Sequence, residues 1–119
     1  MDEQLYRDII LEHWKYPHHY GLITNPTISI TKNNPLCGDV ITLTAKITEG
    51  KISEIGFESE GCAIAKAAAS ILTDLVEGKT LKEIKKITPE AFLAELAVVL
   101  TPSRTKCALL SFSAIKNIH

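Results

Sequence analysis

Three cysteines and one aspartate are the residues of this chain best suited to metal or sulfur chemistry. Cys37 lies in the stretch NPLCGD, residues 34–39, and Asp39 follows it by two residues. The surrounding residues favour turns, so we expect Cys37 in a bend that solvent or a ligand can reach. Cys62 lies in EGCAIAKA and Cys107 in SRTKCALL. Cys62 follows Cys37 by 25 residues, and Cys107 follows Cys62 by 45 residues. These separations are not those of a CxxC pair or a zinc finger.

Two interpretations of the cysteines compete. The pattern places Cys62 where a strand meets an alanine-rich helix, and Cys107 in the first turn or so of the last helix. Near a helix N-terminus the backbone N–H groups favour a thiolate, the form that binds metal and attacks sulfur. Three thiolates and one carboxylate make a tetrahedral set for zinc or for iron in a cluster, and in an extended Cys-Gly-Asp both Cys37 and Asp39 face one side. Taken singly, however, Cys62 and Cys107 are more often small buried hydrophobes.

The histidines supply no ligand pattern of their own. His13 lies on the apolar stripe of the first helix, where a core or interface role is favoured over ligation. His18 and His19 in the turn YPHHYG, and His119, lack ligand spacing to a cysteine motif. No histidine is in evidence to activate Cys37 in a Cys–His hydrolase. Three aromatic residues of this region are expected to pack against the sheet: Trp14, Tyr16 and Tyr20.

The elements that position these residues follow from the hydrophobic periodicity. Residues 2–15 have apolar residues at helical spacing, and Pro17 ends the run. Three segments near residues 27–31, 41–47 and 54–58 alternate apolar and polar residues, which predicts strands with one buried face. Glu49-Gly50 predicts a tight hairpin between the last two strands, so we expect an antiparallel sheet.

The second half of the chain is predicted to be helical. An alanine-rich helix begins at Ala63 and ends near Gly78. Thr80 and Glu83 form a capping box for a short helix, and Thr88-Pro89 begins another that runs toward Leu100. Pro102-Ser103 introduces one last helix, with Cys107, Leu110, Ala114 and Ile118 on a shared face. This order predicts an α+β fold, with the helices packed on one face of a three-stranded antiparallel sheet and the N-terminal helix first.

Composition excludes several classes of protein. The chain has 119 residues, which predicts a single domain over residues 1–119. Its formal net charge of −1 gives no sign of a nucleic-acid-binding surface. No apolar run approaches about 20 residues, so no membrane span is expected. The polar N-terminus is unlike a signal peptide, so we expect a cytoplasmic protein with free thiols rather than a disulfide scaffold.

The three cysteine motifs together resemble those of a known family. NPLCGD, EGCAIAKAAAS and RTKCALL are similar, in order and context, to the motifs of the U-type iron–sulfur assembly family, which comprises IscU, the N-terminal domain of NifU, and SufU. LYRDIILEHWKYPHHYG is similar to the opening helix of that family and its Pro-x-x-x-Gly turn. The likeness extends from Leu5 to about Ala114. It implies an α+β fold with a site at one end of the sheet.

The resemblance also implies a function and a set of site residues. The family accepts persulfide sulfur from a cysteine desulfurase of the SufS, IscS or NifS type and supplies iron–sulfur clusters to apo acceptor proteins. Cys37, Asp39, Cys62 and Cys107 match its ligand positions, around one zinc ion or a transient [2Fe–2S] cluster. Cys37 is the first candidate persulfide acceptor and Cys107 the second. Arg104 is a candidate stabiliser of anionic sulfur, although a solvated surface arginine is the more frequent case.

Two features leave the exact role open. Lys106 stands where IscU-like members carry histidine, which resembles SufU-like members that bind zinc and relay sulfur. The segment from Thr80 to Pro102 nevertheless lacks the insertion usual in SufU. The sequence is therefore compatible with a cluster scaffold, with a zinc-dependent sulfurtransferase, or with both. The alternative is a non-catalytic, zinc-stabilised adaptor that binds and regulates a cysteine desulfurase.

Overall fold

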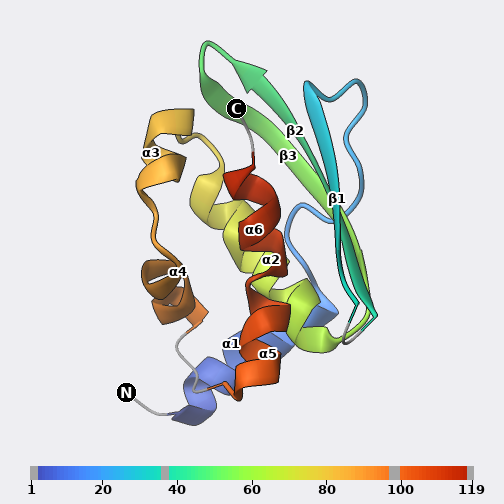
Figure 1. The fold of residues 1–119 in the computed structure, drawn as a ribbon, viewed down its shortest axis with the longest axis vertical. Coiled ribbons are helices and arrows are strands. Elements are labelled where there is room, and N and C mark those ends of the chain that lie inside the picture. The colour runs from blue at the N-terminus through green and yellow to red at the C-terminus, as the bar shows by residue number, and fades with distance from the viewer. Residues whose placement is uncertain (1–2, 36–37, 97–99, 118–119) are drawn as a thin grey trace.

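The chain forms one helix, a three-stranded sheet and then five further helices within residues 3–35, 38–96 and 100–117, which are the residues that the computed structural model describes (Figure 1). The predicted α+β order, with the N-terminal helix first, is confirmed. The elements are α1 (Glu3–Lys15), β1 (Ile28–Asn34), β2 (Asp39–Thr48), β3 (Lys51–Glu60), α2 (Ala63–Val76), α3 (Leu81–Lys86), α4 (Pro89–Leu96), α5 (Pro102–Ala108) and α6 (Leu110–Lys116).

The sheet is antiparallel, in the order β1-β2-β3. Glu49 and Gly50 form the predicted two-residue hairpin between β2 and β3, and both have positive φ angles, of 54° and 77°. A turn with two positive φ angles matches the right-handed twist of the strands that it joins. At the opposite end of the sheet, Asn34 pairs with Asp39.

One face of the sheet carries the core. On β2, the buried side chains of Ile41, Leu43 and Ala45 share this face, and Leu43 and Ala45 lie opposite Phe57 and Ile55 of β3. Helices α2 and α6 cover this face (Figure 1). The predicted packing of helices on one face of the sheet is therefore confirmed.

The start and end of α2 follow from local sequence. Cys62 is its N-cap, and Gly78, with a φ of 82°, follows its C-cap Glu77. Its alanine-rich face is buried, which allows the backbone of α2 to approach its neighbours closely. The predicted capping box of Thr80 and Glu83 is present at the start of α3. None of the described helices is long and apolar enough to cross a membrane.

The prediction of one continuous last helix is wrong. Helix α5 ends at Ala108 and α6 begins at Leu110, with Leu109 between them at a ψ of −2°. Residues on both sides of this break are buried, from Cys107 and Ala108 to Leu110 and Ser111. Consecutive residues of a straight helix point about 100° apart, so four buried residues within five positions cannot all lie on one face of a single straight helix. The predicted contribution of Ile118 to this face lies outside the described residues.

Candidate metal centre

Three of the four predicted ligands meet at the end of the sheet opposite the Glu49-Gly50 hairpin. Asp39 is the first residue of β2, Cys62 is the N-cap of α2, and Cys107 is the penultimate residue of α5. One carboxylate oxygen and the two Sγ atoms all lie within 4.8 Å of one another. Cys37, the fourth predicted ligand, lies outside the described residues.

Asp39 is almost completely buried, with 1% of its surface exposed. Its Oδ1 accepts a hydrogen bond from the backbone N–H of Cys62 at 2.8 Å, and the Cys62 thiol lies 3.6 Å from Oδ2. A buried carboxylate requires hydrogen bonds or a cation to offset the loss of hydration. These contacts join the start of β2 to the start of α2.

Cys62 is placed by the N-terminus of α2. Its backbone is extended, and its Sγ accepts a hydrogen bond from the backbone N–H of Ala65 at 3.4 Å. Serine, threonine and aspartate usually serve as N-caps in this way. The thiol is half-buried, between the helix N-terminus and the Asp39 carboxylate.

Cys107 is buried, with 4% of its surface exposed, and Nδ2 of Asn34 lies 3.9 Å from its Sγ. The prediction that it lies in the first turn of the last helix is wrong, because α5 starts at Pro102 and ends one residue after Cys107. Of these two cysteines, Cys62 alone lies at a helix N-terminus.

Two residues of this centre were not predicted from the sequence. Gly61 has a φ of 123°, and a Cβ atom there would lie 2.1 Å from Oδ1 of Asp39. Only glycine leaves room for the carboxylate so close to the backbone. Asn34 is buried beside Cys107. A glycine just before Cys62, and an asparagine three residues before Cys37, were the available signals.

One geometric premise of the predicted site is wrong. The extended conformation predicted for Cys-Gly-Asp is not present at Gly38, which has a φ of 72° and whose N–H donates to the Asn34 carbonyl at 2.8 Å. Gly38 is therefore not in the extended conformation on which the predicted alternation of side chains depends.

The chemistry of this donor set fits a thiophilic metal. Two thiols and a carboxylate suit zinc or iron in a cluster better than magnesium or calcium.

The model of the NifU-like N terminal domain family matches residues 5–118 of the chain. The chain belongs to this family. The resemblance drawn from the three cysteine motifs is thus confirmed.

Relatives within the NifU-like N terminal domain family carry two kinds of name. The chain is 36% identical to the iron-sulfur cluster assembly scaffold protein IscU of Streptococcus pyogenes serotype M1, over 94% of this chain and 80% of the relative. It is 34% identical to the zinc-dependent sulfurtransferase SufU of Bacillus subtilis, over 96% of this chain and 88% of the relative.

Solved structures of similar fold cover nearly the whole chain. A crystal structure of a hypothetical protein matches with 34% identity and a TM-score of 0.80, over 97% of this chain and 96% of that one. The N-terminal part of a nitrogen-fixing NifU-like protein from Brucella abortus matches with a TM-score of 0.76, over 97% and 92% of the two chains. Its identity of 21% supports the fold alone.

The two basic residues near the third cysteine of this NifU-like domain are exposed. Arg104 is in the first turn of α5, where its backbone N–H donates to the side chain of the N-cap Thr101. Lys106 is exposed beside the buried Cys107.

His13 lies where α1 packs against α2. His13 is half-buried, and its Nδ1 lies 2.7 Å from Oγ of Ser70, so it is an interface residue as expected. Burial, reinforced by His18, lowers the pKa of His13 below its ordinary value.

Of the three aromatic residues, Tyr20 packs edge-on against Phe57 at 5.2 Å between ring centroids. The expectation that Tyr16 packs against the sheet is wrong, because 73% of its surface is exposed. Trp14 is also exposed.

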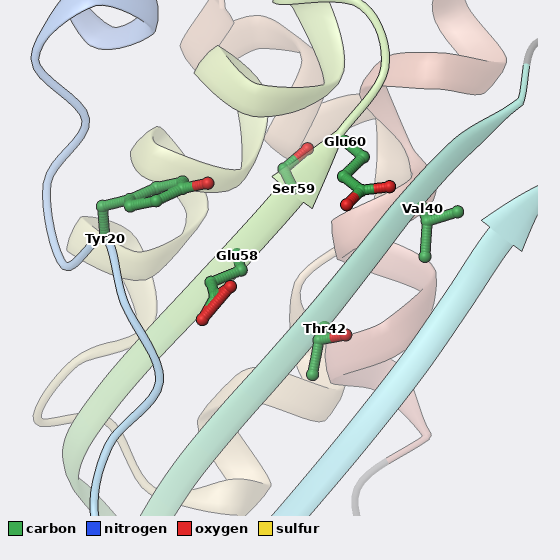
Figure 2. Close-up of a pocket in the computed structure, with 6 residues that line it drawn as sticks. All are labelled: Tyr20, Val40, Thr42, Glu58, Ser59 and Glu60. Carbon is green, nitrogen blue, oxygen red and sulfur yellow. The ribbon is translucent and has the colours of Figure 1, made fainter.

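A pocket of about 210 Å³ opens on the face of the sheet away from α2 and α6 (Figure 2). It is lined by one residue from the segment between α1 and β1 and by residues of β2 and β3: Tyr20, Val40, Thr42, Glu58, Ser59 and Glu60. Val40 and Thr42 alternate with the buried Asp39 and Ile41 along β2. The sheet therefore separates this acidic pocket from the core face.

Proposed function

We propose that this chain is an iron–sulfur cluster biogenesis protein that accepts persulfide sulfur from a cysteine desulfurase and assembles it, or relays it, toward clusters. The observation that carries the proposal is the convergence of Asp39, Cys62 and Cys107 within 4.8 Å from β2, α2 and α5. Relatives named as a cluster assembly scaffold and as a zinc-dependent sulfurtransferase support it.

The proposed site consists of Cys37, Asp39, Cys62 and Cys107, around one zinc ion or a transient [2Fe–2S] cluster. A bound zinc ion would offset the charge of the thiolates and keep them deprotonated. Asp39 is the hard and more easily displaced member of this set. A carboxylate among thiolates favours exchange over permanent occupancy.

Cys37 is the proposed acceptor of sulfur. Its thiolate would attack the terminal sulfur of the desulfurase cysteine persulfide. The sulfur–sulfur bond of that persulfide breaks, the desulfurase cysteine leaves as a thiolate, and Cys37 becomes the persulfide, with no net oxidation. Cys107 is the second candidate, but its burial hinders its attack on the persulfide of a partner. Cys62 is held by Ala65 and Asp39 at the start of α2.

The exposed Arg104 stays a candidate for stabilising anionic sulfur, because guanidinium groups recognise anions and its side chain can reach solvent. The proposed partners are a cysteine desulfurase and apo iron–sulfur acceptor proteins. The adaptor alternative requires the same metal site but no sulfur on this chain. Sulfur transfer therefore separates the two functions.

The test is anaerobic incubation of the chain with a cysteine desulfurase and cysteine carrying labelled sulfur. Alkylation and peptide mapping then locate the persulfide. We expect label on Cys37, its loss in Cys37→Ser, slower labelling in Arg104→Gln, and unchanged labelling in the control Lys82→Gln, whose side chain is exposed on α3. Ferrous iron is added in a second step, and bound iron, sulfide and visible absorbance are measured. Stimulation of the desulfurase without label on any cysteine and without a cluster would establish the adaptor instead.

A further inference from the structure

A second cluster of metal-ligating side chains lies where α1 and the turn after it meet α2. His13 on α1, His18 in the turn and Asp74 on α2 each offer one ligand atom, and these atoms lie within 4.8 Å of one another. The rings of His13 and His18 are 4.5 Å apart between centroids. In the described part of the chain, the other group of this kind is the cysteine centre.

A buried serine holds both histidines in place. The Oγ of Ser70 is 2.7 Å from Nδ1 of His13 and accepts the backbone N–H of His18 at 2.7 Å. Ser70 itself is fully buried on α2. Asp74 lies one turn further along the same face of α2, since residues four apart on a helix are neighbours. The three candidate ligands therefore converge from three segments that are already fixed relative to one another.

The cluster is open to ions from solvent. The side chains of His18 and Asp74 are 53% and 42% exposed, and His18 Nδ1 lies 2.5 Å from Oδ2 of Asp74. His19 is next to them. Its Nδ1 lies 3.0 Å from Oγ1 of Thr73 and 3.5 Å from Oδ1 of Asp74, and its Nε2 lies 3.1 Å from Oε2 of Glu77. His19 therefore approaches the carboxylate oxygen of Asp74 opposite the one that His18 contacts, and its closer partners are Thr73 and Glu77.

The donor types select the class of ion. Two imidazole nitrogens and one carboxylate oxygen, completed by water, are a donor set for zinc and similar borderline divalent ions. Calcium and magnesium prefer a shell composed of oxygen ligands. The absence of thiols from the cluster also distinguishes it chemically from the cysteine centre.

We propose that His13, His18 and Asp74 bind a divalent transition-metal ion of the zinc class, at a site separate from the cysteine centre. Ser70 is eight residues beyond Cys62, which is about 12 Å along the helix axis. Zinc bound here joins α1 and its following turn to α2. The site does not depend on the function proposed for the cysteines, because it shares no ligand with them.

The test is a zinc titration of the full chain in competition with a chromophoric chelator, after one equivalent of zinc has been added for the cysteine centre. We expect a further zinc ion to bind with micromolar affinity. In His18→Asn this affinity should fall by about tenfold or more, because a ligand is lost. In the matched control His19→Asn it should change much less, because His19 contacts Asp74 only at 3.5 Å and on the other carboxylate oxygen. Asparagine tolerates the φ of 60° at this position.

Nitrogen NMR of the imidazole side chains assigns the site directly. Zinc should shift the ring nitrogens of His13 and His18 much more than those of His19, whose Nδ1 approaches Asp74 without being a ligand. Absence of a further micromolar zinc site, retention of that site in His18→Asn, or equal loss in His19→Asn would each overturn the proposal. Cys62→Ser tests the cysteine centre and is expected to leave the histidine shifts intact. The histidine site and the cysteine centre can therefore be confirmed or refuted independently of each other.

Discussion

Asp39 shows how one buried side chain can hold a site together. Its carboxylate accepts the N–H of Cys62 and lies beside the Cys62 thiol, although the two residues are 23 positions apart. Gly61 makes this possible, since any side chain there would overlap the carboxylate. At the scale of single residues, the geometry of the centre therefore depends on the carboxylate of Asp39 and on the absence of a Cβ atom at Gly61.

Replacement of Asp39 by alanine should lower the free energy of unfolding by about 1–3 kcal/mol, because the Cys62 N–H loses its acceptor in a buried place. Asp39→Asn keeps an acceptor oxygen and should lose less. If Asp39 is the displaceable ligand, both variants should transfer a bound cluster to an apo acceptor more slowly. Urea unfolding and transfer rates measure the two effects. Unchanged transfer in both variants would limit Asp39 to a structural role.

Gly61→Ala should be more damaging than Gly78→Ala. Both glycines have positive φ angles, of 123° and 82°, so alanine strains the backbone at each by about 1 kcal/mol. Only at Gly61 does the new Cβ also meet Asp39, whereas nothing lies within 4 Å at Gly78. Urea unfolding and zinc content of both variants check this. Equal stability and equal zinc content would contradict the predicted overlap.

Helix α3 shows how a short element depends on its ends. A helix of six residues is too short to be stable by itself. Thr80 and Glu83 form a capping box at its start, and Lys116 of α6 donates to the carbonyls of Ile84, Lys85 and Ile87 near its end. At the scale of elements, α3 is stabilised by one local motif and one distant ammonium group.

Lys116→Met should lower the free energy of unfolding by about 1–3 kcal/mol, because it removes charged hydrogen bonds to three carbonyls while keeping an apolar stem. Lys82→Met is the matched control, since Lys82 is exposed on the same helix α3. We expect the control to change stability by less than about 0.5 kcal/mol. Chemical denaturation measures both variants, and equal effects would contradict the capping role of Lys116.

Glu83 should make the stability of the chain sensitive to acid. Hydrogen bonds with the backbone and side chain of Thr80 lower the pKa of Glu83 in the folded state. The unfolded state therefore binds this proton first, so the contribution of Glu83 is complete above the ordinary glutamate pKa of about 4.3 and is lost as the pH falls through the folded value. Compared with Glu83→Gln, the native chain should lose more stability between about pH 5 and 3. Parallel curves in thermal melts would contradict this.

At the scale of the whole molecule, the cysteine centre takes its ligands from the sheet and from two helices. Asp39 belongs to the sheet, Cys62 to α2 and Cys107 to α5, so an ion bound among them joins elements that are separate in the sequence. Binding to the folded state alone stabilises it by mass action. Metal occupancy and global stability should therefore be linked.

Zinc removal should lower the melting temperature. With free zinc about a hundredfold above its dissociation constant, binding contributes about 2.7 kcal/mol, or on the order of 10 °C for a chain of this size. The measurement is thermal unfolding with and without a chelator, in the His18→Asn background so that the second cluster is silent. Cys62→Ser in that background should be insensitive to the chelator. A metal-free chain with unchanged melting and freely reactive thiols would contradict the proposed centre.

Much of the fold was predictable from local sequence. The Glu49-Gly50 hairpin, the Thr80 capping box and the end of α2 at Gly78 each depend on residues within a few positions of one another. Strand alternation and helical periodicity are local signals of the same kind. The candidacy of Asp39 and the cysteines also came from short motifs, and the family assignment from their combination.

What the sequence by itself did not determine involves residues far apart in the chain. The break at Leu109 follows from burial on both sides of the helix, which periodicity over a few turns does not reveal. The contact of Gly61 with Asp39 depends on how the start of α2 meets the sheet. The approach of His18 to Asp74 spans 56 positions, and the packing of α1 on α2 decides it. Local preference chooses each helix and strand, whereas burial of their apolar faces decides which distant side chains become neighbours.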